Sequence, residues 1–383
     1  MVLIMSSTAA NFGSQESQMQ AYLAEGERRA LALDNRGPIL LNDDGSVDQS
    51  ILDAYWKYGF YVFTGVIERE ELVDLERDVE EMQSRKPVVR NGPIDAQGRP
   101  ALSTECEAKN LLWVKPLSDP TGGTNKASGR HPVKMFEPEV PADAPEHVLQ
   151  LILGSLQFSD ACLRVYAHPK LLAVAEAING EDFTPFNEGV WFKYPGLGGS
   201  VAWHQDGTTQ WDRPDFDRQT HGFNFMLQLH GCTAANGLWV VPGSHVGRAD
   251  IKAMCGSEGS DRLAAAIPLI CEPGDVAICN RQAVHGSFAN TSPDLRVTIN
   301  FGFHKRSSVL GSTGNGIHSP KAVYDSARIQ ERSRLIGYGI DARKQRFPGE
   351  EVFDYKPFEG LEYHYDDEAR LGLKDYNLLD LGI

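Results

Sequence analysis

From residue 183 onward the chain reads as a series of short β-strands separated by turn residues, and this pattern limits its fold more than any other feature. The runs are rich in β-branched and aromatic residues, and glycine, proline and asparagine fall between them. Several short strands with turn signals between them predict a β-sandwich or a double-sheet barrel. The expected strands are Asn187–Tyr194, Phe223–Gly231, Leu238–Val241, Val276–Cys279, Val284–Ala289 and Leu295–His304.

The chain before residue 183 predicts helices. We expect one over Gln18–Leu33, an amphipathic one over Ile67–Gln83 and two between Val148 and Asn179, broken near His168-Pro169. The stretch from Tyr58 to Phe63 indicates a helix end that runs into a buried strand.

Two segments show little periodicity. Residues 86–145 are rich in proline and glycine, which indicates a long irregular insertion, either a lid over a binding pocket or a structural wrap. After Lys305 the chain turns irregular, then charged and aromatic as far as Ile383. Neither segment carries an internal repeat.

A possible metal site begins at Trp203-His204-Gln205-Asp206. A histidine and an aspartate two residues apart on an extended segment point their side chains to the same side. One more histidine, for which we select His285, would complete two imidazoles and one carboxylate. This is the ligand set of the facial triad in non-haem Fe(II) oxygenases, which leaves positions open for a cosubstrate and O2.

A second stretch has the same spacing, His364-Tyr365-Asp366, near the C-terminus. No glycine-rich β segment with another histidine follows it. We therefore interpret it as a surface or packing pair.

Charge and termini exclude some functions. The formal net charge is −15 with no basic run, which disfavours a nucleic-acid or anionic-membrane partner. The apolar start, Met1 to Met5, is too short for a signal peptide or a membrane span. Six cysteines without a C-x-x-C pair suggest reduced thiols, so we expect a soluble cytoplasmic protein.

The order of several motifs resembles the phytanoyl-CoA dioxygenase (PhyH-like) family of Fe(II)/2-oxoglutarate oxygenases. The resemblance covers about residues 50–85 and 165–305. The motifs are W-H-x-D at 203–206, N-G at 236–237, V-P-G-S-H at 241–245, P-G-D at 273–275, H-G-S at 285–287 and Arg296. The resemblance implies a double-stranded β-helix (jelly-roll, cupin-like) core flanked by helices, a mixed α/β chain with a mainly β core. It also implies Fe(II), 2-oxoglutarate as cosubstrate and O2.

The residues past the second histidine suit a carboxylate clamp. Arg296 offers a planar fork that can hold a carboxylate with two parallel hydrogen bonds. Ser287, two residues after His285, shares its face if the strand continues and can donate to the same carboxylate. In the family the equivalents of Arg296 and Ser287 bind the distal carboxylate of 2-oxoglutarate. Halogenating relatives carry a small residue at the position of Asp206, so the resemblance implies a hydroxylase type of oxygenase.

Other residues leave alternatives open. Asn224 and Gln228 share one strand face with Met226 and His230, and they either line the pocket and contact the cosubstrate or are satisfied core amides.

Three further side chains have less specific signals. We interpret Lys193 as solvated, because lysine seldom lies buried, and His245 as part of its turn. Trp211 either walls the substrate site or serves packing.

We interpret the chain as a single oxygenase domain over residues 1–383. It would consist of N-terminal helices and an insertion (1–182), a jelly-roll core (183–305) and a C-terminal extension (306–383). The expected reaction hydroxylates an unactivated C–H bond of a small-molecule metabolite. Within the enzyme class, acyl-CoA hydroxylation, cyclisation and desaturation stay open, as does homo-oligomerisation. The alternative from another class is a non-catalytic metal-binding cupin that acts as a sensor or scaffold.

Overall fold

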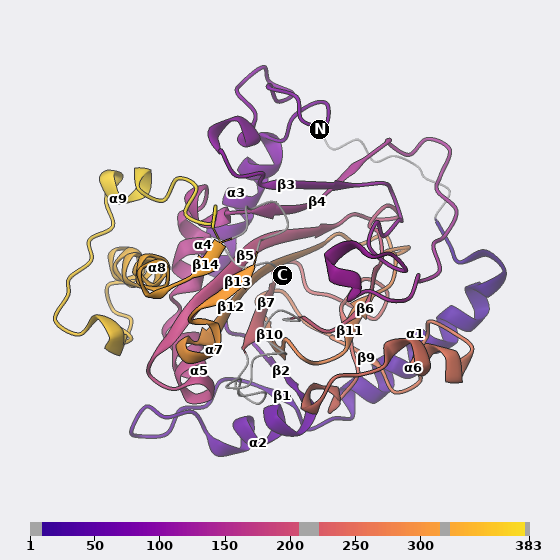
Figure 1. Cartoon of the computed structure of the whole chain (residues 1–383), viewed down its shortest axis with the longest axis horizontal. Coiled ribbons are helices and arrows are strands. Elements are labelled where there is room, and N and C mark those ends of the chain that lie inside the picture. Colours follow the sequence, from indigo (N-terminus) through magenta and orange to yellow (C-terminus); the bar gives the residue numbers. More distant parts are fainter. Residues whose placement is uncertain (1–9, 207–221, 315–321, 380–383) are drawn as a thin grey trace.

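The fold is built on two β-sheets (Figure 1), and the computed structural model describes residues 10–206, 222–314 and 322–379. The larger sheet has eight strands in the order β1-β2-β10-β7-β12-β5-β4-β3. The strands β1 and β2 run parallel and all other neighbours are antiparallel. Its strands are β1 (Arg36–Gly37), β2 (Phe60–Phe63), β3 (Leu111–Val114), β4 (Val148–Leu153), β5 (Phe183–Lys193), β7 (Phe223–Gln228), β10 (Val276–Asn280) and β12 (Arg296–Lys305).

The smaller sheet has four antiparallel strands in the order β6-β11-β8-β9. They are β6 (Val201–His204), β8 (Trp239–Val240), β9 (Ile267–Pro268) and β11 (His285–Ser287). A separate two-stranded ribbon joins β13 (Ser312–Gly314) to β14 (Ala322–Tyr324).

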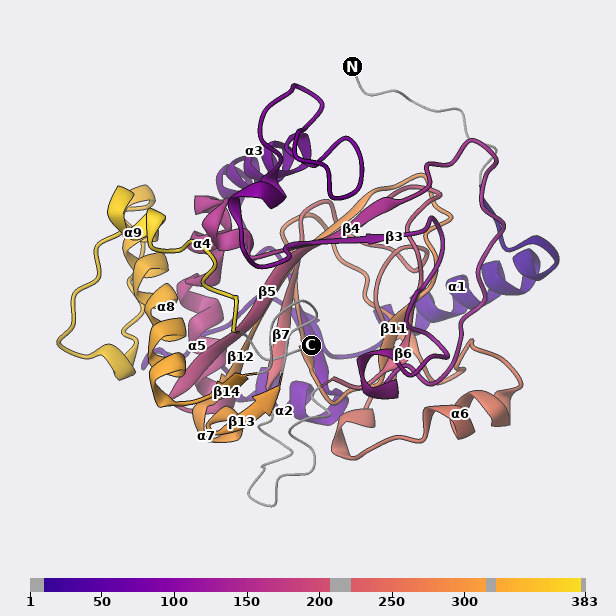
Figure 2. The same ribbon diagram turned by 45° about the horizontal axis from the view of Figure 1, so that its top comes forward.

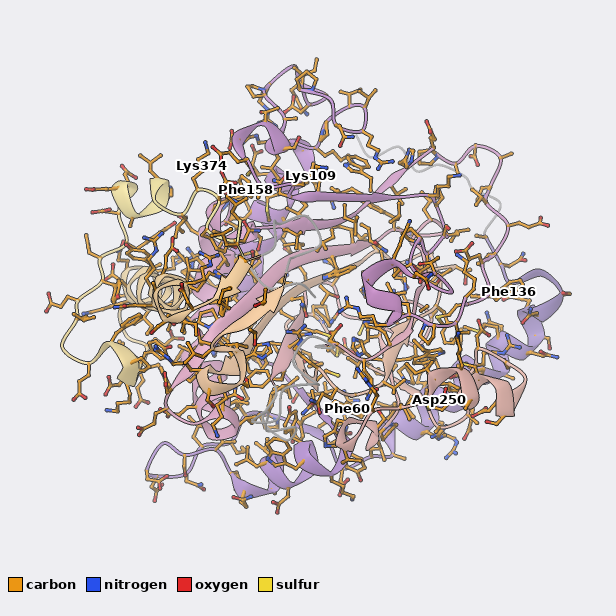
Figure 3. The ribbon with its side chains drawn as sticks, viewed as in Figure 1. Phe60, Lys109, Phe136, Phe158, Asp250 and Lys374 are labelled. Atoms are coloured by element: carbon orange, nitrogen blue, oxygen red, sulfur yellow. The ribbon has the colours of Figure 1, made fainter. Side chains whose placement is uncertain are left out.

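The two sheets pack against each other through an apolar layer. Phe60, Val62 and Met226 of the larger sheet cluster with Val240 and Ile267 of the smaller one. Phe60, labelled in Figure 3, is almost fully buried there. Two antiparallel sheets packed face to face, flanked by helices, confirm the predicted mixed α/β chain with a double-stranded β-helix core.

Helices cover the outer faces of both sheets (Figures 1 and 2). The outer face of the larger sheet packs on α3, α4, α5 and α8, and the smaller sheet packs on α1 and α6. The helices are α1 (Glu16–Leu31), α2 (Gln49–Tyr58), α3 (Arg69–Ser84), α4 (Asp160–Tyr166), α5 (Pro169–Asn179), α6 (Ile251–Glu258), α7 (Arg306–Val309), α8 (Ser326–Arg346) and α9 (Asp367–Leu371). In the described ranges, no helix combines the length and the apolar character needed to cross a membrane.

Successive side chains of β7 point alternately into the helix-covered core and into the layer between the two sheets. Phe223, Phe225 and Leu227 point into the helix-covered core, and Met226 points into the layer between the sheets. This confirms the predicted division of the two faces of that strand. It also places Asn224 and Gln228 on the inner face.

The predicted passage from helix to strand at Tyr58–Phe63 is confirmed. Gly59 ends α2 with a φ of 81°, a left-handed conformation that favours glycine. A Cβ on Gly59 would lie 2.5 Å from Nδ1 of His245, whose Nε2 lies 3.0 Å from the Trp56 carbonyl oxygen. His245, which lies in its own short helical turn Ser244–Val246, thus also packs against the turn between α2 and β2, a contact that the sequence did not predict.

Three elements differ from the expectations. Residues 148–153 form β4 and not a helix, because all six are buried in the sheet between β3 and β5. The predicted break near His168 is confirmed, and the second helix ends at Asn179 as expected. The insertion contributes β3, and the C-terminal part contains the 21-residue helix α8, which its polar sequence did not reveal. Four strands of the larger sheet thus precede residue 183, although the expected core began there.

Candidate metal and cosubstrate site

The strands β6 and β11 bring His204 and His285 together. The two residues are direct partners in the antiparallel ladder, and their ring centroids are 4.1 Å apart. The register shifts between His285 and Ser287, a β-bulge of the kind often found beside active sites. Gly286 permits this close packing, because a Cβ there would lie 2.9 Å from the carbonyl oxygen of Val201.

Both histidines present the same ring nitrogen to the centre of the site. Nδ1 of His204 lies 2.8 Å from the Ala202 carbonyl oxygen, and Nδ1 of His285 lies 2.8 Å from the Ala283 carbonyl oxygen. A carbonyl only accepts, so each Nδ1 carries a hydrogen and each Nε2 is the nitrogen turned toward the centre of the site. Burial and the neighbouring rings of His131 and His285 keep the pKa of His204 well below its usual range, so that imidazole is neutral. This is the state that binds a metal.

Asp206 completes the group from just beyond the end of β6. Its backbone N–H donates to the Arg281 carbonyl, and its carboxylate oxygens lie 3.5 Å from Nε2 of His204 and 3.6 Å from Nε2 of His285. Burial alone would raise the pKa of Asp206, but the Arg130 guanidinium and the other positive groups outweigh it and keep the pKa below its usual range. The carboxylate is therefore ionised.

The three side chains fit a divalent metal ion. One ligand atom from each lies within 4.8 Å of the others, and all three residues are buried. Oδ1 of Asp206 is buried without a hydrogen-bond partner, which suits a ligand atom. Separations of 3.5–3.6 Å between ligand atoms are compatible with one ion at about 2.0–2.2 Å from each. In the described part of the chain no other group of this kind occurs. Two imidazoles and one carboxylate are the set expected for Fe(II).

A free guanidinium edge lies at the start of β12. Nη1 of Arg296 donates to the Asn236 carbonyl at 3.1 Å, which explains the N-G motif as a support for this side chain. Nε of Arg296 is buried without a hydrogen-bond partner, and Nη2 bonds to no described residue. The Nε–Nη2 edge of a guanidinium is the side that binds a carboxylate with two parallel bonds. The structure therefore leaves free the edge that the predicted clamp requires.

Lys193 is buried at this site, which corrects the expectation that it is solvated. It is 3% exposed and lies opposite Arg296 in the pairing of β5 with β12. Its Nζ donates to Oγ of Ser287 at 2.7 Å and to the Phe288 carbonyl oxygen. Because the Ser287 oxygen accepts from Lys193, the Ser287 hydroxyl keeps its own hydrogen for another acceptor. Burial first, and then the charge of Arg296, lower the pKa of Lys193 well below its usual value.

The two amides proposed as cosubstrate contacts differ in their bonding. Oε1 of Gln228 accepts from the Thr298 hydroxyl at 2.9 Å, and its Nε2 donates to the Met226 carbonyl. Gln228 is thus satisfied within the sheet. Oδ1 of Asn224 is buried without a hydrogen-bond partner, so it has an acceptor to offer. A cosubstrate role for either residue stays a prediction.

Part of the insertion lies directly on the triad. The short helical turn Lys126–Gly129 lies beside β6 in Figures 1 and 2, and the two residues after it reach the metal ligands. The ring of His131 stacks on that of His204 with centroids 4.1 Å apart, and Nη1 of Arg130 lies 3.3 Å from Oδ1 of Asp206. The sequence of the insertion gave no sign that these two residues touch the ligands.

The remaining candidates lie apart from the site or outside the described residues. His364 is 73% exposed and pairs with Asp341, as expected for a surface pair. Trp211 lies outside the described residues.

Arg281, with Nε 4.0 Å from Oδ2 of Asp206, was not foreseen, because nothing in its local sequence distinguishes it from a surface arginine.

Comparison with known proteins gives curated relatives over parts of the chain. "Phytanoyl-CoA dioxygenase 1" of Oryza sativa subsp. japonica is 32% identical over 116 residues, which are 27% of this chain and 39% of that protein. "Phytanoyl-CoA dioxygenase domain-containing protein 1" of Rattus norvegicus is 26% identical over 185 residues, 45% of this chain and 62% of that protein. The chain thus matches less than two thirds of the length of either relative.

Among solved structures, EctD from S. alaskensis, determined with 2-oxoglutarate and 5-hydroxyectoine, is similar with a TM-score of 0.49 and 18% identity. That similarity covers 71% of this chain and 81% of the other. The model of the family described as "Phytanoyl-CoA dioxygenase (PhyH)" matches residues 55–298, well over half of the chain. The match includes His204, Asp206, His285 and Arg296, and the chain belongs to the phytanoyl-CoA dioxygenase family.

Proposed function

We propose that this chain is an Fe(II)- and 2-oxoglutarate-dependent dioxygenase that oxidises a small molecule. The observation that carries the proposal is the combination of two sites in one interior. His204, His285 and the ionised Asp206 form a ligand set that suits Fe(II), and the free edge of Arg296 suits a carboxylate. Family membership supports the same conclusion.

His204, Asp206 and His285 would hold the metal, and Arg296 with Ser287 would hold the distal carboxylate of 2-oxoglutarate. When bound, Fe(II) and 2-oxoglutarate would supply the electrons that reduce O2, with 2-oxoglutarate converted to succinate and CO2 and one oxygen atom passed to the substrate.

The protein contributes position and charge. The carbonyls of Ala202 and Ala283 fix the two imidazole tautomers, and the Asn236 carbonyl fixes the guanidinium. Lys193 fixes the oxygen of Ser287, so the hydroxyl hydrogen can turn toward the carboxylate.

We infer a hydroxylase type of reaction, because Asp206 supplies a carboxylate where halogenating relatives have a small residue. The expected outcome is R–H + O2 + 2-oxoglutarate → R–OH + succinate + CO2. The names of the rice and rat relatives point to acyl-CoA substrates. No basic cluster suited to the phosphates of coenzyme A stands out in the sequence, which favours a free metabolite.

The rival function is a metal-binding sensor or scaffold without turnover. A simple metal-binding cupin has no need of a carboxylate clamp, so the buried free edge of Arg296 argues against it. The test is O2-dependent formation of succinate from 2-oxoglutarate with Fe(II), with His285→Ala as the inactive control. Wild-type protein that binds Fe(II) yet forms no more succinate than the variant would support the rival.

A further inference from the structure

Arg130 is a buried cation that reaches the metal site from the insertion. Its side chain is 8% exposed, although it lies in a loop of few regular elements. Nη1 lies 3.3 Å from Oδ1 of Asp206, and Nε lies 3.3 Å from Nε2 of His131. Nη2 bonds to no residue in the described part of the chain. The guanidinium is therefore held from one side, and donors are left on the other.

His131 fixes this position. Its Nδ1 lies 3.1 Å from the Ala202 carbonyl oxygen, and its ring stacks on His204. Its Nε2 accepts from Nε of Arg130 at 3.3 Å. The insertion is thus tied to the strand that carries the first metal ligand.

A bound metal ion would weaken the attraction between Asp206 and Arg130. Asp206 then shares its negative charge with the ion, and the guanidinium faces a cation of higher charge at close range. In a buried site such a repulsion is poorly screened, and an unpaired buried cation is costly. A negative group beside Nη2 would remove both penalties.

We propose that Arg130 binds a carboxylate of the substrate, so that the molecule oxidised at this metal site is a small carboxylic acid. This inference rests on the proposed function and deepens it. Nη2 has no partner among the described residues, and the two nitrogens at one edge of a guanidinium match the two oxygens of a carboxylate. The substrate would then lie between the metal and the insertion, with the C–H bond to be oxidised near the anchored end.

The test uses the protein loaded with Co(II), which is expected to occupy the same ligands without reacting with O2, and saturated with 2-oxoglutarate. Acetate is the probe, because it consists of a carboxylate and a single methyl group, and acetamide is its neutral counterpart. Each is titrated at constant ionic strength while the visible absorbance of Co(II) is recorded. Arg130→Met removes the proposed anchor, and Lys126→Met removes an exposed charge from the same segment as a matched control.

We expect saturable acetate binding in the wild type and in Lys126→Met, and no response to acetamide. In Arg130→Met the dissociation constant for acetate should rise about tenfold or more, since one partner of a shielded charge pair is lost. An equal affinity in Arg130→Met, or no acetate binding to the wild-type complex, would overturn the inference.

The two proposals fail in different ways. Binding of Co(II) and of 2-oxoglutarate is measured before acetate is added. If the proposed function is wrong, the protein will not form the complex with Co(II) and 2-oxoglutarate. If Arg130→Met does not load metal, Arg130→Lys decides the question. Lysine keeps the charge but not the fork, so acetate binding should weaken several-fold, and an unchanged affinity would contradict the assignment.

Discussion

Replacement of Arg296 by methionine tests the cosubstrate site most directly. Arg296 is buried, its Nη1 donates to the Asn236 carbonyl, and its Nε–Nη2 edge is free for a carboxylate. Loss of one partner from a shielded charge pair costs about 2–5 kcal/mol. We expect the lower part of that range, about 2–3 kcal/mol, because Lys193 and Ser287 stay in place and keep some attraction for the carboxylate. That corresponds to a dissociation constant for 2-oxoglutarate that is about 30- to 150-fold higher.

The measurement is a titration of 2-oxoglutarate into anaerobic Fe(II)-loaded protein, with metal affinity determined separately by equilibrium dialysis. Metal binding should stay the same, because Arg296 contacts none of the three ligands among the contacts that the structure shows. The control is Arg28→Ala, which removes an arginine that is 68% exposed and pairs only at the surface. An unchanged 2-oxoglutarate affinity in folded Arg296→Met protein would show that the clamp lies elsewhere.

Three further predictions test the metal site, the bulge and the insertion. His285→Ala should lose tight binding of Fe(II) and all turnover, and His364→Ala should keep both, as measured by dialysis and succinate formation. Gly286→Ala should lower the free energy of unfolding in denaturant by about 1–3 kcal/mol, because its Cβ would meet the Val201 carbonyl. Gly247→Ala, where a Cβ meets nothing within 4 Å, should cost little, and equal losses in the two variants would refute the packing argument. Amide hydrogen exchange in residues 116–132 should slow when substrate joins the metal–2-oxoglutarate complex if this segment is a lid, whereas equal exchange in both states favours a fixed wrap.

The ligands of the site could be predicted because their signals are local. His204 and Asp206 lie two residues apart on one strand, and Arg296 follows His285 at a spacing typical of the family. The burial of Lys193 could not be predicted in this way. Its partner Ser287 is 94 residues away in the sequence. Without that partner in view, a lysine is expected at the surface, because lysine is seldom buried.

Two elements were misjudged for a similar reason. Residues 148–153 are buried on both faces of the sheet, so they show no alternation, and an unbroken apolar run reads equally well as a helix. In α8 the buried face includes Arg328, Arg332 and Arg343, and buried arginines conceal a helical pattern that depends on apolar residues. Both features become visible only once their neighbours are known.

The proposed metal ligands and the guanidinium of the proposed clamp belong to different sheets, and this division sets the distance that a cosubstrate has to span. Two metal ligands stand on β6 and β11 of the smaller sheet, and Arg296 stands on β12 of the larger one. The apolar layer between the sheets, with Phe60 and Val240, fixes their separation. If the proposed sites are right, the spacing of the two sheets would select the chain length of the cosubstrate: a 2-oxo diacid one carbon shorter would reach the metal or the guanidinium but not both. A large-to-small substitution in that layer, far from any reacting atom, would weaken the discrimination between diacids of different length before it affected metal binding.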